Sequence, residues 1–296
     1  MSMLLRLLLP KSNHQPPSTT LWISLLFILL VAPAAFAATP DTDTTAAHTK
    51  NSSGLAKKIR NDKLTQFLSQ VTAEDQQAIS NLIDQYRKAP VIKQPFDSNR
   101  LSYGAPGAPL RMVEWVDMQC SHCRNLFMAL QDIKQMVPEG SWSLESRNYP
   151  LDGECNPQAG RSRKPGVSCL AAKVLICTAD RPDAESVRHK IFDQQRILIK
   201  ERIWNVAATD EASRKKLEAC VDSEQTRATI LADIADAEAY GFEGTPLVVI
   251  NGRKAPSSPP IVYALILAEG DADAEPFKAL PPPQKIEAHD ASHDHH

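Results

Sequence analysis

The sequence lacks a strong excess of charge of either sign. Lysine and arginine together number 33 against 35 aspartates and glutamates, and the formal net charge is −2. Aromatic residues make up only 6% of the chain and do not alternate with basic residues. Because a nucleic-acid partner requires a concentrated positive field, we expect none here. The hydrophobic content of 43% is ordinary for a globular protein.

Long apolar runs are also scarce, and the one that stands out lies near the start. It covers residues 21–31, follows the positive residues Arg6 and Lys11, and is followed by Ala35-Phe36-Ala37. This pattern predicts a secretory signal peptide over 1–37, cleaved after Ala37, and hence a periplasmic or otherwise exported protein. The alternative is a retained membrane anchor, since the uncharged run nearly reaches spanning length.

A second pair of closely spaced cysteines is absent. The chain has six cysteines, an even number that allows 15 pairings, and outside the cytosol thiols tend to be paired. Only Cys120 and Cys123 are close neighbours in the sequence. A structural zinc site commonly uses two such pairs, so zinc is the weaker interpretation. We expect no metal and no cofactor at this site.

Both ends of the exported chain differ from its middle. Residues 38–54 are rich in Thr, Ala, Ser and Asp and predict a flexible lead-in. A helical pattern then runs through an N-terminal extension over 55–95, which either oligomerises or packs on the core. The oligomeric state stays open. Residues 271–296 are acidic, then Pro-rich, then His-rich, and predict a disordered tail. The tail contains four histidines, which are candidate metal ligands, but ligands on an unordered segment bind weakly, so we expect an inert tail rather than a metal site. The histidines are His289, His293, His295 and His296.

The middle of the chain predicts an α/β fold. A buried strand over 110–117 precedes a helix over 124–136 and a second strand over 142–149, which indicates a parallel pair with a crossover. A long helical stretch follows to about residue 240, and an apolar strand comes at 247–250.

The motif Cys120-Ser121-His122-Cys123 stands where the strand ends and the helix begins. Partial positive charge and unpaired N–H groups at a helix N-terminus stabilise a thiolate. His122 lies between the cysteines and is a further candidate to donate to it. We therefore expect a lowered pKa for Cys120, the attacking residue, while Cys123 resolves the mixed disulfide.

Glu114 is a charged residue within the predicted buried strand. A carboxylate there is costly unless it has a partner or a role. Near Cys123 it is a candidate to accept or relay a proton during exchange. The alternative is a partly exposed residue at a strand edge.

Three segments together resemble the thioredoxin superfamily, and its DsbA-like periplasmic thiol–disulfide oxidoreductases most. They are Val113-Glu114-Trp115, the CxxC motif, and Gly244-Thr245-Pro246 ahead of an apolar strand. The resemblance implies a thioredoxin-like domain over 96–270, with a helical insertion at about 152–240. It also implies that Pro246 is a cis-proline facing the cysteines, with Thr245 pairing to a substrate chain, and that a buried acid matches Glu114.

In that family the implied activity is dithiol oxidation of exported proteins, with a membrane redox partner for reoxidation. Two residues depart from the pattern: Ser121 replaces the usual proline, and Thr245 is reminiscent of disulfide isomerases. An isomerase or reductase is therefore the second hypothesis. A peptide-binding chaperone without turnover is the third.

The other four cysteines are predicted to form structural disulfides. Cys155 and Cys169 flank a loop, while Cys177 and Cys220 lie on different helices of the insertion. We expect the pairs Cys155–Cys169 and Cys177–Cys220. A catalytic relay through Cys155 is the alternative.

Overall fold

The computed structural model describes residues 42–284. The predicted signal peptide and the histidine-rich end therefore lie outside the described residues. The chain divides into two units, residues 1–59 and residues 60–296. None of the helices within 42–284 is both long enough and apolar enough to cross a bilayer.

Helix α2 (Thr42–Gln70) begins inside the segment predicted to be a flexible lead-in. The difference concerns residues 42–54, which are helical although no apolar periodicity marks them. Once a helix is nucleated, each added residue contributes a hydrogen bond, and this segment has no proline to stop it. In the first unit Leu55 and Ile59 are exposed.

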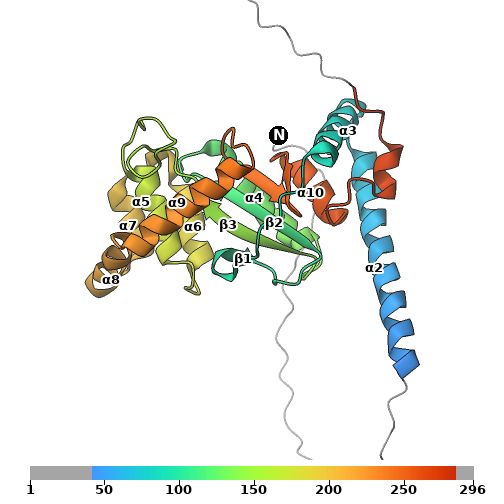
Figure 1. The fold of residues 1–296 in the computed structure, drawn as a ribbon, viewed down its shortest axis with the longest axis horizontal. Helices are drawn as coiled ribbons and strands as arrows, with labels where there is room; N and C mark the ends of the chain where they lie inside the picture. Colours follow the sequence, from blue (N-terminus) through green and yellow to red (C-terminus); the bar gives the residue numbers. More distant parts are fainter. Residues whose placement is uncertain (1–41, 285–296) are drawn as a thin grey trace, which may run out of the picture. The chain divides into compact units, whose positions relative to one another are not determined.

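The second unit confirms the predicted α/β class. Its sheet contains the strands β1 (Leu101–Tyr103), β2 (Leu110–Val116), β3 (Trp142–Asn148), β4 (Leu247–Ile250) and β5 (Arg253–Ala255). Its helices are α3 (Ala73–Lys88), α4 (Ser121–Met136), α5 (Val167–Cys177), α6 (Ala184–Asp193), α7 (Lys200–Ala207), α8 (Glu211–Val221), α9 (Glu224–Ala239) and α10 (Pro259–Leu267) (Figure 1). Short 3-10 turns are η1 (Ser98–Arg100), η2 (Gln195–Ile197) and η3 (Glu275–Ala279).

The sheet has the order β1-β3-β2-β4-β5. β2 and β3 are parallel, as the strand–helix–strand pattern predicts, while β4 runs antiparallel to β2. All residues of β2 except Arg111 are buried. Covered faces on both sides explain why this strand is a nearly continuous apolar run, and they place Glu114 inside the protein.

Helices α5 to α9 follow β3 and precede β4 (Figure 1). Helices α5 to α8 share an apolar cluster with α4, in which Phe127 of α4 packs with Phe192 of α6. Cys123 belongs to the same cluster. The insertion therefore forms part of the wall behind the redox motif.

Helix α3 packs back onto the sheet, one of the two roles considered for the N-terminal extension. Its N-cap is Thr72, whose side chain accepts a hydrogen bond from the Asp75 N–H. The buried Tyr86 donates its hydroxyl toward the carbonyls of Ile250 and Gly270, at 3.2 and 3.1 Å. The helix is thus anchored to the end of β4.

The C-terminal segment differs from the prediction of disorder after residue 270. Residues 271–284 are ordered, and Phe277 in η3 is buried. Ser80 and Gln77 of α3 donate side-chain hydrogen bonds to the carbonyls of Pro281 and Pro282. The prediction was wrong here because a proline-rich composition shows that a segment lacks its own secondary structure, not that it lacks a surface to pack on.

Candidate active site

The two cysteines of the motif stand at the start of α4. Cys120 is the N-cap residue with extended backbone angles, φ −77° and ψ 119°. Cys123 follows in the first turn and is fully buried, whereas Cys120 is partly exposed. Both are free thiols in this structure. One sulfur is therefore accessible to another molecule, and the other is shielded behind it.

The pKa of the Cys120 thiol is lowered from 9.0 to about 6. The largest cause is a hydrogen bond from the Cys123 thiol, which lowers the pKa. Burial acts in the opposite direction and raises it. Hydrogen bonds from the Thr245 side chain and from the N–H groups of Cys123 and His122 lower the pKa further. At pH 7 such a group is roughly nine-tenths thiolate.

Cys123 has the opposite character. Burial raises the pKa of its thiol well above the ordinary value, and the neighbouring Cys120 raises it further. The Asp117 N–H points at its sulfur over 3.5 Å and opposes this effect. Cys123 therefore keeps its proton where Cys120 has lost one, which allows it to act as the hydrogen-bond donor.

Thr245 and Pro246 lie against the cysteines although they are far away in sequence. The Thr245–Pro246 peptide is cis, as the family resemblance implies. The Cys120 thiol lies 3.2 Å from the Thr245 carbonyl oxygen. The Thr245 hydroxyl is buried and has no hydrogen-bond partner among the described residues. It is thus available to the thiolate when Cys120 ionises.

His122 contributes differently from the prediction. Its side chain is exposed, and its contribution to the lowered pKa of Cys120 comes from the backbone N–H. The imidazole is not among the groups that hydrogen-bond to the thiol in the described structure. The side chain of the second residue after an N-cap points outward, while its N–H faces the cap.

Glu114 is fully buried, and its partners are not the cysteines. Its Oε1 accepts hydrogen bonds from Arg188 Nη2 at 2.7 Å and from the Ser146 hydroxyl at 2.8 Å. Its Oε2 has no partner in the described part of the chain. None of these contacts reaches either sulfur, so the proton-relay role stays a proposal.

A family model described as Thioredoxin matches residues 97–266, more than half of the chain. The chain belongs to the thioredoxin family. With two neighbouring free thiols at the start of α4, this thioredoxin-family protein is a thiol–disulfide oxidoreductase. No curated protein matches it.

Several solved structures resemble the chain at low identity. α-DsbA1 of Wolbachia pipientis is 18% identical with a TM-score of 0.48, covering 60% of this chain and 94% of its own. Oxidised BdbD from Bacillus subtilis is 18% identical with a TM-score of 0.49, and the match covers 62% of this chain and 98% of that protein. Reduced DsbA1 from Neisseria meningitidis is 19% identical with a TM-score of 0.41, and the match covers 64% of this chain and 93% of that protein. The family model, rather than these structures, carries the assignment.

Residues 117–120 of this thioredoxin-family protein form the loop between β2 and α4, and residues not predicted from the sequence hold this loop in place. The buried Asp117 accepts hydrogen bonds from the N–H groups of Gln119 at 2.6 Å and Leu151 at 2.7 Å. Burial raises the pKa of the Asp117 carboxyl, and these N–H groups oppose the rise. Gln195 donates to the carbonyls of both Met118 and Cys120 at 2.9 Å.

A sequence signal existed for Asp117 but not for Gln195. Asp117 is an acid directly after a buried strand and three residues before the first cysteine, where it can bond its own loop. Gln195 lies 75 residues from Cys120 in the helical insertion. The sequence pattern does not predict a contact between residues so far apart in the chain.

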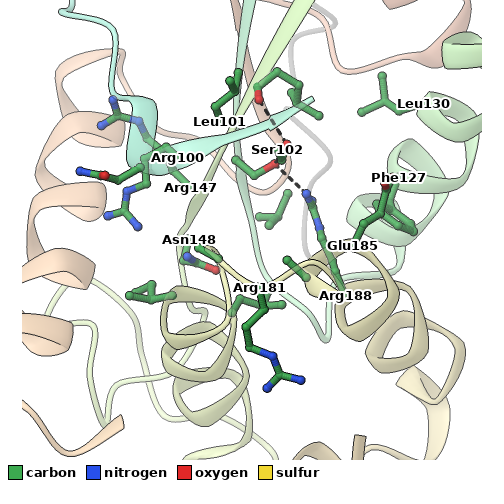
Figure 2. Close-up of a pocket in the computed structure, with 18 of the residues that line it drawn as sticks. Arg100, Leu101, Ser102, Phe127, Leu130, Arg147, Asn148, Arg181, Glu185 and Arg188 are labelled. Carbon is green, nitrogen blue, oxygen red and sulfur yellow. Dashed lines mark hydrogen bonds between the residues drawn. The ribbon is translucent and has the colours of Figure 1, made fainter. Parts of the chain in front are cut away.

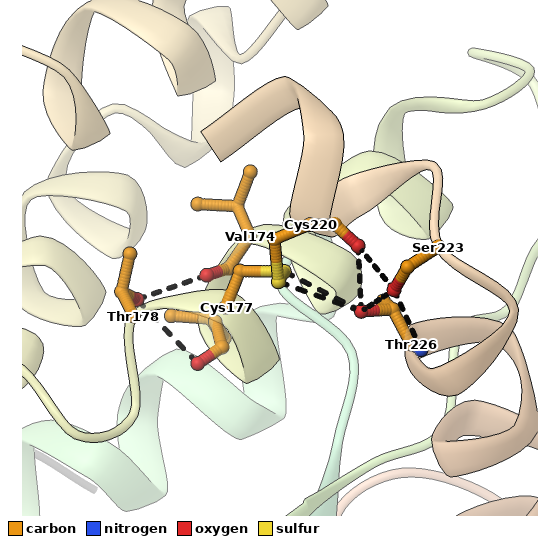
Figure 3. The surroundings of a disulfide bond; sticks show 7 residues. Val174, Cys177, Thr178, Cys220, Ser223 and Thr226 are labelled. Atoms are coloured by element: carbon orange, nitrogen blue, oxygen red, sulfur yellow. Dashed lines mark hydrogen bonds between the residues drawn. A yellow bond between two sulfur atoms is a disulfide. The ribbon is translucent and has the colours of Figure 1, made fainter. Parts of the chain in front are cut away.

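The remaining cysteines are paired as predicted from the sequence. Cys155 is bonded to Cys169, and Cys177 to Cys220. The second bond joins α5 to α8, and the Thr226 hydroxyl lies 3.4 and 3.6 Å from its two sulfurs (Figure 3). The first closes the loop that follows β3. With Cys155 bonded to Cys169, the pairing gives no support to a relay through Cys155.

A cavity of about 310 Å³ lies on the Arg188 side of the buried acid. Figure 2 shows Arg188 on the same side of the cavity as Phe127 and Leu130 of α4, with Arg100 and Arg147 on the other side. The Arg188 guanidinium donates to the Ser146 hydroxyl at 2.6 Å. Every charged side chain that lines the cavity forms an ion pair, including Lys134 with Glu185 at the rim. No charged side chain that lines the cavity is therefore left unpaired to bind a charged ligand.

Proposed function

We propose that the protein is a DsbA-like dithiol oxidase of exported proteins, acting through Cys120 and Cys123. The observation that carries the proposal is the pair of opposed pKa shifts, lowered to about 6 at Cys120 and raised at Cys123. A stabilised thiolate favours the reduced enzyme, and a stable reduced form makes the disulfide oxidising.

The reaction starts from the oxidised Cys120–Cys123 disulfide. A substrate thiolate attacks the exposed Cys120 sulfur, the bond to Cys123 breaks, and Cys123 leaves and takes up a proton. A second substrate thiolate then attacks the substrate sulfur of the mixed disulfide and displaces Cys120 as a thiolate. The substrate has lost two electrons and gained a disulfide, while the enzyme holds both electrons as a thiolate and a thiol.

The low pKa of Cys120 favours this direction. A thiol of lower pKa leaves faster in exchange. Relative to an ordinary thiol of pKa 9.0, a pKa of about 6 favours the reduced form roughly tenfold at pH 7, which shifts the potential by about 30 mV toward oxidising values.

Isomerase or reductase activity is the alternative within the same chemistry. Ser121 between the cysteines and Thr245 before Pro246 support it. Measuring the reduction potential against glutathione distinguishes the two directions. A value near about −120 mV supports the oxidase, and one near about −270 mV excludes it.

A peptide-binding chaperone is the alternative from another class. The variant Cys120→Ser separates it from an enzyme, because a chaperone would keep its activity and an exchange enzyme would lose it. The oxidase further implies exported thiol-containing substrates and a membrane redox partner that reoxidises the cysteines. Export itself rests on the predicted signal peptide with cleavage near Ala37.

A further inference from the structure

A groove of about 410 Å³ opens directly beside Pro246. Three parts of the chain line it: residues 243, 244 and 246–248 around the start of β4, residues 254–257 after the turn, and the C-terminal end of α3 at Gln85, Tyr86 and Ala89. The first two belong to the segment matched by the thioredoxin family model, whereas α3 lies outside it. The N-terminal extension therefore supplies a wall that the family fold does not include.

The wall is fixed in place by hydrogen bonds to backbone carbonyl groups. Arg253 donates to the carbonyls of Arg87 and Ala89 at 3.0 and 2.5 Å, which satisfies carbonyl groups at the end of α3. The Ile92 N–H donates to the Gly252 carbonyl at 2.8 Å. α3 is thus joined to the same β-turn that connects β4 to β5, and it holds its position relative to Pro246.

The groove lies within reach of a polypeptide bound at the redox site. The Cys120 sulfur is 3.2 Å from the Thr245 carbonyl, and the residues on either side of Thr245 line the groove. An extended chain advances roughly 3.3 Å per residue. A substrate joined to Cys120 and running along Thr245 therefore places a side chain in the groove within about three residues of its own cysteine.

The lining indicates which side chain fits. Its lining is mixed: Leu247, Ala255 and Pro256 are apolar, whereas Gln85 and Ser257 are polar and uncharged. Its charged residues, Glu243 and Lys254, form an ion pair over 3.0 Å and cancel each other. A side chain entering here meets a mixture of apolar and neutral polar surface and no net charge. An uncharged side chain is therefore favoured over a charged one, which would lose hydration without gaining an unpaired partner.

We propose that the C-terminal turn of α3, at Gln85 and Ala89, is one wall of a substrate subsite. The subsite takes an uncharged side chain of an extended, cysteine-containing polypeptide, close to the cysteine that reacts. This inference rests on the proposed function, and it makes the N-terminal extension a determinant of substrate selection.

The test compares two thiols in exchange with the oxidised full-length protein. One is glutathione, which is too small to reach the groove. The other is a seven-residue peptide with a central cysteine and leucines two and three positions to either side. The measured quantity is the ratio of the peptide rate to the glutathione rate.

The variant Gln85→Trp fills the groove from the α3 wall, and Ser257→Trp fills it from the opposite wall. Each is expected to lower the ratio about tenfold, mainly through a higher KM for the peptide. The matched control is Ala78→Trp, at an exposed position of α3 away from the groove, which leaves the ratio as it is in the unchanged protein.

An unchanged ratio in both groove variants overturns the subsite, as does an equal fall with Ala78→Trp. If the unchanged protein exchanges with neither thiol, the proposed function fails, and the subsite fails with it. A different outcome is normal exchange with glutathione and a peptide-to-glutathione rate ratio that neither groove variant changes. This outcome excludes only the subsite and leaves the proposed function standing.

Discussion

Replacing Cys123 tests the physical basis of the low pKa at Cys120. The hydrogen bond from the Cys123 thiol is the largest cause of that low pKa, and burial ensures that Cys123 is protonated and able to donate. Cys123→Ala removes the donor and leaves the rest of α4 in place. Cys123→Ser keeps a donor of similar size and serves as the matched control.

The magnitude follows from the charge on the acceptor. A hydrogen bond to a charged group contributes about 1.5–3 kcal/mol, and one pKa unit corresponds to 1.36 kcal/mol. The pKa of Cys120 in Cys123→Ala should therefore rise by about one to two units from the value of about 6. At pH 7 the thiolate fraction should fall from roughly nine-tenths to half or less.

Thiolate absorbance at 240 nm, followed from pH 3 to pH 10, measures this pKa in the reduced protein. The rate of alkylation by iodoacetamide over the same range is an independent readout. If Cys123→Ala titrates like the unchanged protein, the thiol of Cys123 is not what stabilises the thiolate. If Cys123→Ser shifts as far as Cys123→Ala, the effect comes from the sulfur itself and not from donation.

The same pKa has a consequence for stability. The folded pKa of Cys120, about 6, lies below that of an unfolded cysteine. The thiolate therefore stabilises the folded reduced protein fully above the unfolded pKa, and this contribution is lost as the pH falls through about 6. Urea unfolding of the reduced and oxidised proteins should show the reduced form gaining relative stability from pH 6 to about pH 8. At higher pH the raised pKa of Cys123 opposes a further gain, because the unfolded chain releases this proton and the folded protein keeps it. A difference that does not vary with pH would contradict the lowered pKa.

Three further predictions concern other contacts. Thr245→Val removes a hydroxyl that can donate to the thiolate, so the pKa of Cys120 should rise in the absorbance titration; an unchanged or lower pKa would show that the hydroxyl does not donate. Arg188→Met leaves a buried carboxylate without its cation and should cost about 3–5 kcal/mol in urea unfolding, whereas the exposed Arg196→Met should change stability by no more than about 0.5 kcal/mol. Replacing both Cys177 and Cys220 by alanine opens a bond that spans 43 residues and should cost about 4 kcal/mol by the loop-entropy model; a loss below about 1 kcal/mol would show that the bond does not constrain the unfolded chain.

The local parts of the site were predictable from the sequence because they depend on neighbours in the chain. A buried strand that ends at Val116, followed by a helix that starts at Ser121, places Cys120 at a helix N-terminus. The helical period then puts Cys123 one turn further and on the buried side. These conclusions need only the order of residues and the geometry of a helix.

The partners of the buried groups were not predictable in the same way. The sequence shows that Glu114 needs a partner if it is buried, but not that the partner is Arg188, 74 residues away in the insertion. The start of α2 and the ordered segment 271–284 were missed for a related reason. Their composition is polar or proline-rich, and their order comes from helix propagation in one case and from packing against α3 in the other.

The sequence alone therefore determined the α/β class and the position of Cys120 and Cys123 at the start of a helix that follows a buried strand. The tertiary structure decided what surrounds them: Thr245 beside Cys120 across 125 residues, Arg188 against Glu114, and α3 along the groove beside Pro246. The physical reason is that helix starts and strand periods arise from short-range backbone geometry. Contacts between distant residues, in contrast, exist only after the helices and the sheet have buried their apolar faces against one another.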